Sequence, residues 1–448
     1  MSKKQPSANV IKSALKGSNS EIEAPIKTPN TTTSSIQFRI FVGSYEHNLL
    51  CLSVILDPKN EKEPVFQPIF HFQAHSLSIK TIDLAKRYLV TGSNDEHIRI
   101  YDLQKRKELG TLLSHQGTIT ALKFSKEINT TTEETQDNLN TGKWLLSGSE
   151  DGKIIIWRTK DWEVFATLKG HTKRINDLSI HPSGKVAISV SEDQTIRLWN
   201  LLTGKKASIL KIKGKDHLGQ SGQFVKWSTD GKQFLVGLSN QTLIYNTSNG
   251  KIFKKLKFKS TIMCMDIVKF NDGKDDNINE WLGIGFSDGS IGFYDYQSII
   301  SQDKEEEEEK IWDSKPEEVD AIYRLQGHTN RIKDFYFLQS QESTENIPLL
   351  VSVSSDGKIV IWNLQLRDQV AIYDTGERLN CIVCAPEHIE KIDTMKRRFE
   401  DTPLDVSESE YETDGEEISK IMIKGEKKKS KKNKNKKNKK RKVNVTLE

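Results

Sequence analysis

Apolar and polar positions alternate in the same way in three segments of the chain, residues 147–157, 189–199 and 352–362. Each segment reads Ser-x-Ser-x-Asp-x-x-Ile-x-x-Trp, with Gly or Gln directly after the aspartate. An aspartate followed by such a residue, between two runs of apolar character, is typical of a tight turn that joins two strands. The pattern therefore predicts three strand–turn–strand units with the same local structure.

Four further copies of this unit are weaker. Three of them, at residues 91–102, 237–246 and 285–295, have tyrosine in place of tryptophan, an exchange that keeps an aromatic ring for packing. The fourth is split between the two ends of the repeat region. Residues 37–55 supply middle strands without a first strand, and residues 379–384 supply a first strand with nothing after it.

Gly-His dipeptides at residues 170–171 and 327–328 stand before two of the strong copies. Gly-His at the start and Trp at the end of units of about 40–50 residues are typical of WD repeats, which form four-stranded blades. One blade cannot bury its two apolar faces alone, so neighbouring blades must stack around a common axis. We therefore predict an all-β fold, a seven-bladed WD-repeat β-propeller with disordered N- and C-terminal tails.

The repeats divide the chain into three parts. Residues 1–36 are rich in Ser, Thr, Asn and Lys, and we expect a disordered N-terminal segment there. Residues 37–386 form the predicted propeller. Its split blade is closed by residues 37–73 and 379–384, because their pairing covers two exposed strand edges. Residues 387–448 form a C-terminal tail.

The polar residues of the repeat predict a hydrogen-bonded network. In the blade that ends at Trp199, His171 in the entering loop, a serine on the second strand and Asp193 in the turn can bond in series. A serine hydrolase site is the alternative, but catalytic triads do not recur blade by blade, and we find no polar constellation at the ring centre outside the repeat register. We expect no catalytic residue, and we assign to structural networks His171, Asp193, Trp199, His328, Asp356, Trp362, Asp151 and Trp157.

Composition indicates neither cofactor nor metal chemistry. The four cysteines lie among apolar residues, where cysteine behaves as a small hydrophobic residue. Cys381 and Cys384 form a Cys-x-x-Cys pair, but a zinc site would need a second pair and a redox site a helix start. The chain has no long apolar run and no secretory signal, so we expect an intracellular protein without cofactor or metal.

Long insertions interrupt the repeat at residues 126–142, 271–280, 301–320 and 339–347, in connections that we expect on one face of the ring. The insertion 301–320 carries ten Asp and Glu against three Lys. A segment with this charge is expected to be solvated and mobile. It is either a plain linker or a site for a basic partner.

The opposite face has short loops, and two of them share a charged pattern. Arg174 and Arg331 occupy the same position of two blades, and Lys173 and Lys333 add positive charge nearby. Arginine suits a contact with a carboxylate or phosphate group. We therefore hypothesise that these four residues bind a partner; the alternative is that they are solvated charges on the rim.

The C-terminal tail contains three patterns. Residues 387–400 have the apolar spacing of a short amphipathic helix. In the acidic run that follows, Ser407, Ser409 and Thr413 each precede an acidic residue and are candidate phosphorylation sites. Basic residues then fill twelve of the sixteen positions 427–442, namely Lys427, Lys428, Lys429, Lys431, Lys432, Lys434, Lys436, Lys437, Lys439, Lys440, Arg441 and Lys442.

This lysine block has no aromatic residue to stack on bases, so it cannot read a nucleotide sequence. It can act as a nuclear targeting signal and make weak, non-specific contacts with RNA. A membrane-surface patch and a solubilising tail are the alternatives. Because no lipidation signal or apolar anchor accompanies the block, we expect a nuclear protein without membrane contact.

Several segments together resemble one small WD-repeat family. They are residues 41–46, 91–102 and 114–119, together with the lysine-rich tail, and the similarity covers about residues 37–400. The fungal members of the family are maintenance-of-killer proteins, and the animal member is a PAK-kinase-interacting protein. The acidic and Asn- and Thr-rich insertions of this chain depart from the family's pattern.

The resemblance implies a non-enzymatic scaffold in the nucleolus that acts in biogenesis of the large (60S) ribosomal subunit. Its implied partners are pre-ribosomal proteins and large-subunit precursor particles, bound by a monomeric propeller within a larger complex. The animal member is also linked to negative regulation of a small-GTPase-activated (PAK) kinase. A signalling adaptor for such a kinase is therefore the alternative function.

Overall fold

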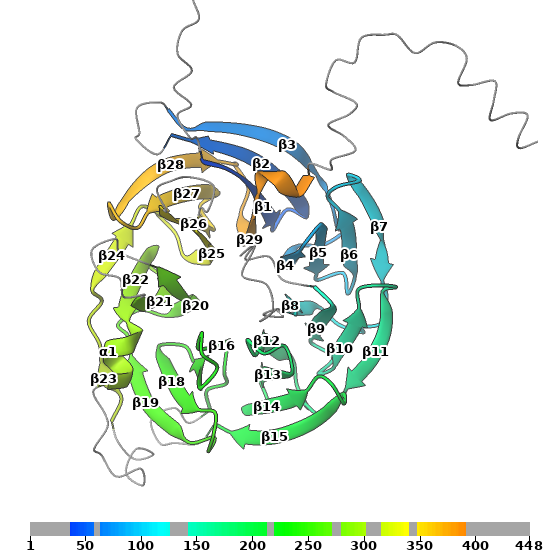
Figure 1. The fold of residues 1–448 in the computed structure, drawn as a ribbon, viewed down its shortest axis with the longest axis vertical. Helices are drawn as coiled ribbons and strands as arrows, with labels where there is room; N and C mark the ends of the chain where they lie inside the picture. The colour runs from blue at the N-terminus through cyan, green and yellow to red at the C-terminus, as the bar shows by residue number, and fades with distance from the viewer. Residues whose placement is uncertain are drawn as a thin grey trace, which may run out of the picture.

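The computed structural model describes residues 36–57, 63–125, 142–212, 219–270, 279–301, 315–339 and 347–390. These residues form seven sheets, arranged as blades around a central axis (Figure 1). In every blade an inner strand lies next to the axis, and the outermost strands lie at the rim. The prediction of an all-β, seven-bladed WD-repeat propeller is confirmed.

The first blade joins the last strand of the propeller to its first three strands, and the next three blades follow in chain order. The first contains β29 (Leu379–Pro386), β1 (Ile36–Ser44), β2 (Asn48–Leu56) and β3 (Val65–Gln73). The second contains β4 (Ile79–Ala85), β5 (Tyr88–Ser93), β6 (Ile98–Asp102) and β7 (Lys107–Leu112). The third contains β8 (Ile119–Phe124), β9 (Trp144–Ser149), β10 (Ile154–Arg158) and β11 (Glu163–Leu168). The fourth contains β12 (Ile175–Ile180), β13 (Val186–Ser191), β14 (Thr195–Asn200) and β15 (Lys205–Lys211).

The other three blades complete the ring. The fifth contains β16 (Phe224–Trp227), β17 (Gln233–Gly237), β18 (Gln241–Asn246), β19 (Ile252–Lys257) and β23 (Glu317–Glu318). The sixth contains β20 (Ile262–Phe270), β21 (Asn279–Phe286), β22 (Ser290–Asp295) and β24 (Tyr323–Gln326). The seventh contains β25 (Ile332–Gln339), β26 (Pro348–Ser354), β27 (Lys358–Asn363) and β28 (Asp368–Asp374).

The turn between the second and third strands of the strong repeats requires a left-handed backbone. Gly152 and Gly357 have φ values of 72° and 85°, and Gln194 has the same kind of conformation in the fourth blade, at 61°. Glycine adopts this region without steric cost. A Cβ atom at Gly152 would also lie 2.9 Å from the carbonyl oxygen of His171, so glycine leaves room for the next blade's loop.

The first blade is built from both ends of the described chain. Strand β29 pairs with β1 in antiparallel register, with Cys384 opposite Ile40 and Ile382 opposite Val42. Strand β1 pairs with β2 along its other edge. This pairing closes the ring, because β29 supplies the inner strand that β1 to β3 lack.

Apolar side chains fill the spaces between neighbouring blades. Between the seventh and first blades, for example, Val351 and Ile361 form one buried cluster with Ile40 and Leu52, and all four side chains are fully buried. Similar clusters recur around the ring. Each blade therefore depends on its neighbours to bury its faces, as expected for a stacked repeat.

Part of the acidic insertion differs from its prediction. Glu317 and Glu318 form strand β23, which pairs in parallel with β19 at the outer edge of the fifth blade. Glu317 lies 2.9 Å from the Lys254 ammonium, and Glu318 lies 3.4 Å from that of Lys257. Both glutamates are exposed, as expected of a solvated segment, but they are not a plain linker, because lysines of β19 attract them and the edge of β19 pairs with their backbone.

Helix α1 (Tyr296–Ser301) leads into this insertion, and its Tyr296 and Ile299 side chains are buried. The Tyr296 hydroxyl lies 2.8 Å from Oε1 of Gln233, the first residue of β17. Residues 302–314 and almost all of the insertions 126–142, 271–280 and 339–347 lie outside the described residues.

A 3-10 helix, η1 (Glu387–Glu390), follows β29. The Arg39 guanidinium donates two hydrogen bonds to Glu387, at 2.8 and 2.7 Å, and Ile389 is buried in the core. The amphipathic helix predicted over 387–400 is thus a 3-10 turn at its start, and residues 391–400 lie outside the described part of the chain. Within that part, no helix is both long and apolar enough to cross a membrane.

Candidate protein-binding face

A buried network fixes the loop that enters the fourth blade. The Nε2 atom of His171 lies 2.7 Å from Ser189 Oγ, and its Nδ1 atom lies 2.9 Å from Asp193 Oδ2. The indole of Trp199 donates to the same serine at 2.8 Å. A neutral imidazole that carries its proton on Nδ1 satisfies all three contacts, because it donates to the carboxylate and accepts from the serine.

The same network is present in the third and seventh blades. Ring nitrogens of His115 and His328 lie 2.8 and 2.9 Å from the serines Ser147 and Ser352. In both blades the second ring nitrogen faces the turn aspartate, and the tryptophan donates to the serine. The structure therefore brings together every His, Asp and Trp that the repeat pattern assigned to these networks, and adds His115.

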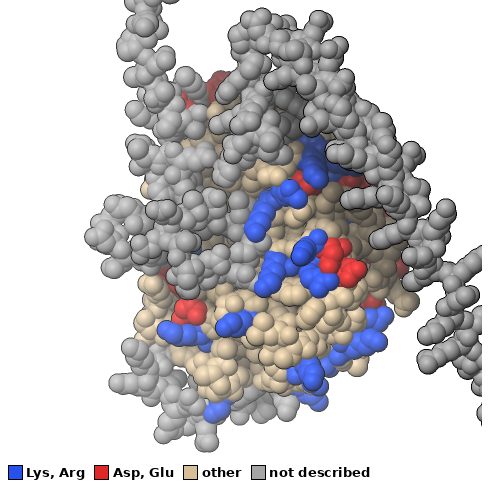
Figure 2. Space-filling view, turned by 45° about the vertical axis from the view of Figure 1, so that its right-hand side comes forward, with Lys and Arg blue, Asp and Glu red and all other residues tan. Residues whose placement is uncertain are grey.

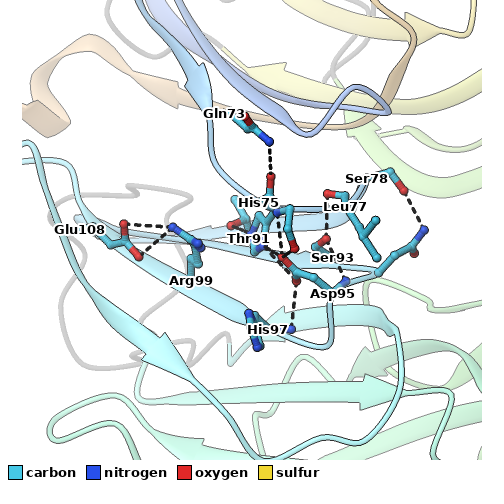
Figure 3. A network of polar contacts seen from close by, with 12 residues as sticks. Gln73, His75, Leu77, Ser78, Thr91, Ser93, Asp95, His97, Arg99 and Glu108 are labelled. Atoms are coloured by element: carbon cyan, nitrogen blue, oxygen red, sulfur yellow. Dashed lines mark hydrogen bonds and ion pairs between the residues drawn. The ribbon is translucent and has the colours of Figure 1, made fainter.

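The second blade has a related network that sequence reasoning missed (Figure 3). Nε2 of His75 lies 2.7 Å from Thr91 Oγ1, and Nδ1 lies 3.0 Å from Asp95 Oδ2. Ala precedes this histidine and threonine replaces the serine, so neither the Gly-His pair nor the Ser-x-Ser pattern is present. The signal that could have revealed this network is the turn aspartate Asp95, which lies twenty residues after His75.

Burial decides the protonation of these networks. It lowers the pKa of His75, His171 and His328, against the opposing attraction of their aspartates. Burial alone would raise the pKa of Asp193, but hydrogen bonds from Thr195 and His171 outweigh it and lower the pKa to about 2. The networks of the second, fourth and seventh blades therefore combine a neutral imidazole with an ionised aspartate at neutral pH.

These networks do not present a nucleophile to a substrate. The side chains of Ser147, Ser189 and Ser352 are fully buried, and each hydroxyl already accepts a bond from an indole. Asp193 also accepts the backbone N–H groups of Thr172 and Thr195, at 3.1 and 3.0 Å. The arrangement joins the entering loop to the turn and stabilises the face of the ring on which Arg174 and Arg331 lie.

The two arginines of this face have different surroundings. Arg174 is exposed, and its guanidinium lies 3.4 Å from the carboxylate of Glu150 in the third blade. Arg331 is also exposed, and its Nε donates to Ser355 at 3.4 Å. No carboxylate pairs with Arg331 among the described residues. Lys173, next to Arg174, is exposed.

Lys333 belongs to a different group of charges from Lys173. It is partly buried on the inner strand β25, two residues after Arg331. Burial, together with the nearby positive charges of Arg331 and Lys80, lowers its pKa. The structure thus brings Arg331 and Lys333 together with Lys80 of the second blade, while Arg174 and Lys173 lie three blades away. Figure 2 shows Lys and Arg side chains outnumbering Asp and Glu on the surface that it turns to the viewer.

Charged residues also lie on the inner strands, contrary to the expectation that the ring centre has no such constellation. Lys226 on β16 forms an ion pair with Asp266 on β20, with 3.1 Å between Nζ and Oδ2. Burial raises the pKa of Asp334 on β25 to about 6, although Lys123 and Lys226 oppose the shift.

The inner-strand aspartates connect successive blades. Carboxylates of Asp83, Asp177 and Asp334 accept backbone N–H groups from the inner strand of the next blade, at 2.6, 2.9 and 3.2 Å. Within the described residues, no group of three or more His, Cys, Asp or Glu is arranged to hold a metal ion. These charges therefore contribute to ring closure.

Comparison with known proteins gives the family. The "WD domain, G-beta repeat" family matches residues 66–102, 137–158, 162–200 and 320–363. Protein MAK11 of Saccharomyces cerevisiae is 50% identical over 423 residues, which cover 92% of this chain and 98% of that protein. The chain belongs to the MAK11 family of WD-repeat proteins.

Animal relatives of this family carry kinase-related names. A p21-activated protein kinase-interacting protein 1-like of Danio rerio is 30% identical over 356 residues, which cover 78% of this chain and 81% of the relative. The p21-activated protein kinase-interacting protein 1 of Homo sapiens is 30% identical over 351 residues, covering 77% and 76%. The recognised resemblance to this family is confirmed, and its WD-repeat fold is one that mediates protein interactions.

The cysteines of this family member are buried and free. Burial raises the pKa of the Cys381 and Cys384 thiols well above the usual value, which disfavours the reactive thiolate. The candidate phosphorylation sites Ser407, Ser409 and Thr413 and the lysine block 427–442 lie outside the described residues and remain predictions.

Proposed function

We propose that this WD-repeat protein is a non-enzymatic scaffold for assembly of the large (60S) ribosomal subunit in the nucleolus. It binds pre-ribosomal proteins through the short-loop face of the propeller and RNA weakly through the lysine block 427–442. The observation that carries the proposal is a basic, short-loop face on a closed ring, stabilised by the buried networks of His115, His171 and His328. The family resemblance and the lysine block support the ribosomal context.

The test is purification of the tagged full chain from cells, with identification of the RNA and proteins that accompany it. We expect precursor RNA and proteins of the large subunit, in excess over a purification of an unrelated tagged propeller. Imaging of the same tagged chain should show nucleolar accumulation. Recovery of neither ribosomal proteins nor precursor RNA would contradict the proposal.

A signalling adaptor is the second candidate, because the names of several relatives state an interaction with a p21-activated kinase. It predicts cytoplasmic residence and a kinase complex free of ribosomal proteins. The same purification therefore separates the two functions, since a kinase recovered without precursor RNA supports the adaptor.

The proposed face is tested by reversing the charge of Arg174 and Arg331 to Glu. We expect weaker association with precursor particles and an unchanged melting temperature, because exposed charges contribute little to stability. A double variant that purifies with normal amounts of precursor would show that docking uses another face.

A further inference from the structure

A cavity of about 420 Å³ opens on the short-loop face where the sixth, seventh and first blades meet. This volume lies within the range of small-ligand and side-chain pockets. Its polar lining consists mainly of side chains that can donate hydrogen bonds. These are Ser287, Thr329, Asn330, Arg331, Ser355 and Arg378.

The guanidinium groups of the two cavity arginines, Arg331 and Arg378, have no anionic partner among the described residues. The N–H of Arg378 donates to Glu46 at 3.0 Å, and its carbonyl oxygen accepts from the N–H of Tyr45 at 2.7 Å. The backbone of Arg378 is therefore fixed while its side chain is exposed. Arg331 has one long hydrogen bond, to Ser355, so neither guanidinium group has to break an ion pair with a described carboxylate before it donates to a ligand.

The one acidic residue in the cavity wall does not neutralise them. Asp288 accepts hydrogen bonds from the Ser290 backbone and hydroxyl, at 2.9 and 2.6 Å, and from the Ser260 hydroxyl at 2.8 Å. Burial would raise its pKa, but the Ser290 and Ser260 bonds lower it. Its carboxylate is therefore engaged in the turn of the sixth blade.

Positive charge continues from the cavity toward the ring axis. Lys333 lies near both Arg331 and Lys80, and burial together with repulsion from these two positive charges lowers the pKa of Lys333. Four basic side chains from the seventh, first and second blades thus share one region without an ion pair between any of them and a described carboxylate. An anionic ligand would relieve this repulsion.

We propose that this cavity, formed around Arg331 and Arg378 and extended by Lys80 and Lys333, binds an Asp- and Glu-rich segment of a partner protein. Planar guanidinium groups match carboxylates in two parallel hydrogen bonds, and the hydroxyl and amide side chains complete the contact. A site for single-stranded nucleic acid combines positive charge with aromatic platforms on which bases stack. Among the described residues, Tyr45 is the one strongly exposed aromatic residue beside Arg378, so this lining favours an acidic protein segment. The inference deepens the proposed function, since it rests on this face being the docking face.

The test measures binding of a short fluorescent peptide rich in Asp and Glu to the purified full chain, with its Asn and Gln counterpart as the neutral peptide. We expect R331E/R378E to weaken binding by about a hundredfold, because each arginine supplies charge-assisted hydrogen bonds worth about tenfold or more. The matched control is K205E/K206E, which removes the same charge from exposed positions on β15. We expect the control to bind within about twofold of the wild type.

A third variant, R331K/R378K, keeps the charge but loses the fork geometry, and we expect an intermediate affinity. Equal weakening by R331E/R378E and K205E/K206E would overturn the proposal, because it would show a response to net charge alone. Binding of the neutral peptide as tightly as the acidic one would also overturn it. So would stronger binding after amide replacement of the acids in residues 407–417, which would make the chain's own tail the occupant.

A single-stranded RNA oligonucleotide that binds more tightly than the peptide, and that is weakened by R331E/R378E but not by K205E/K206E, would likewise refute a peptide site, because this pattern places the RNA in the cavity and not on the lysine block 427–442. Because binding is measured on purified protein, its outcome does not depend on recovery of precursor particles from cells. Peptide binding without particle association would contradict the proposed function only. Particle association without peptide binding would contradict this inference only.

Discussion

The replacement Asp193→Ala tests the role assigned to the repeat networks. It removes four acceptor contacts, from His171 Nδ1, the N–H groups of Thr172 and Thr195, and the Thr195 hydroxyl. Thr172 is exposed, so water can replace the Asp193 carboxylate as the acceptor for its backbone N–H. The His171 side chain and Thr195 are buried and lose partners that water cannot replace.

The expected loss of stability follows from these two buried groups. A stranded buried donor costs about 1–3 kcal/mol, so the loss of partners for His171 and for Thr195 predicts a total of about 2–6 kcal/mol. We expect Asp193→Asn to cost less, because the amide keeps the size of the side chain and one acceptor oxygen.

The assay is the melting temperature of the full chain, combined with its recovery of precursor particles. Glu192→Ala is the matched control, since Glu192 is exposed in the same turn. We expect Asp193→Ala to melt several degrees lower than this control. Equal melting temperatures, accompanied by loss of particle association in Asp193→Ala alone, would refute a structural role and show that Asp193 contacts a partner directly.

Three further predictions concern closure, acid sensitivity and the tail. A fragment that ends before Leu379 should aggregate because β1 then has an unpaired edge, and a soluble fragment with cooperative melting would contradict the closure. The pKa of His75, His171 and His328 is lowered in the folded state, so these residues contribute to the free energy of unfolding above pH 6.5 and should lose this contribution as the pH falls below 6.5. A second loss should follow between about pH 4 and 2 as Asp193 and Asp151 protonate; melting temperatures across this range check both. Replacing the basic residues of 427–442 with Gln should reduce nucleolar accumulation, and an unrelated nuclear signal should restore import but not salt-sensitive RNA recovery; full recovery of RNA would leave the block as a targeting signal alone.

The architecture could be read from the sequence because the same local pattern recurs in register. A turn Asp or Asn and a terminal aromatic residue mark blades even where Tyr101, Tyr245 and Tyr294 replace tryptophan. The network at His75 was hidden because threonine performs the role of serine there. Repeat reasoning recognises residue types at fixed positions, and it misses a different residue that makes the same hydrogen bond.

The surroundings of the basic residues could not be read in this way. Arg174 and Arg331 share a repeat position, yet Glu150 of a neighbouring blade pairs with the first and leaves the second without a carboxylate. Arg378 gave no repeat signal, because it lies in the loop that joins the seventh blade to β29. Which charged side chains pair between blades depends on how the closed ring places neighbouring loops, and the sequence of one repeat does not contain this information. Strand β23 is a similar case, because it comes from the segment that joins β22 and β24 of the sixth blade but pairs with β19 of the fifth blade.

The split first blade affects how the protein is made. Translation delivers β1 early and β29 only after the other six blades have been synthesised. Until then, the inner edge of β1 has no strand to pair with, and an emerging ring remains open. Contacts between residues this distant in the chain form slowly, because their loop entropy must be overcome first. The synthesis of β29 therefore determines when a nascent molecule can close into a propeller. A polypeptide released before Pro386 would expose the unpaired edge of β1, which chaperones and proteases can recognise.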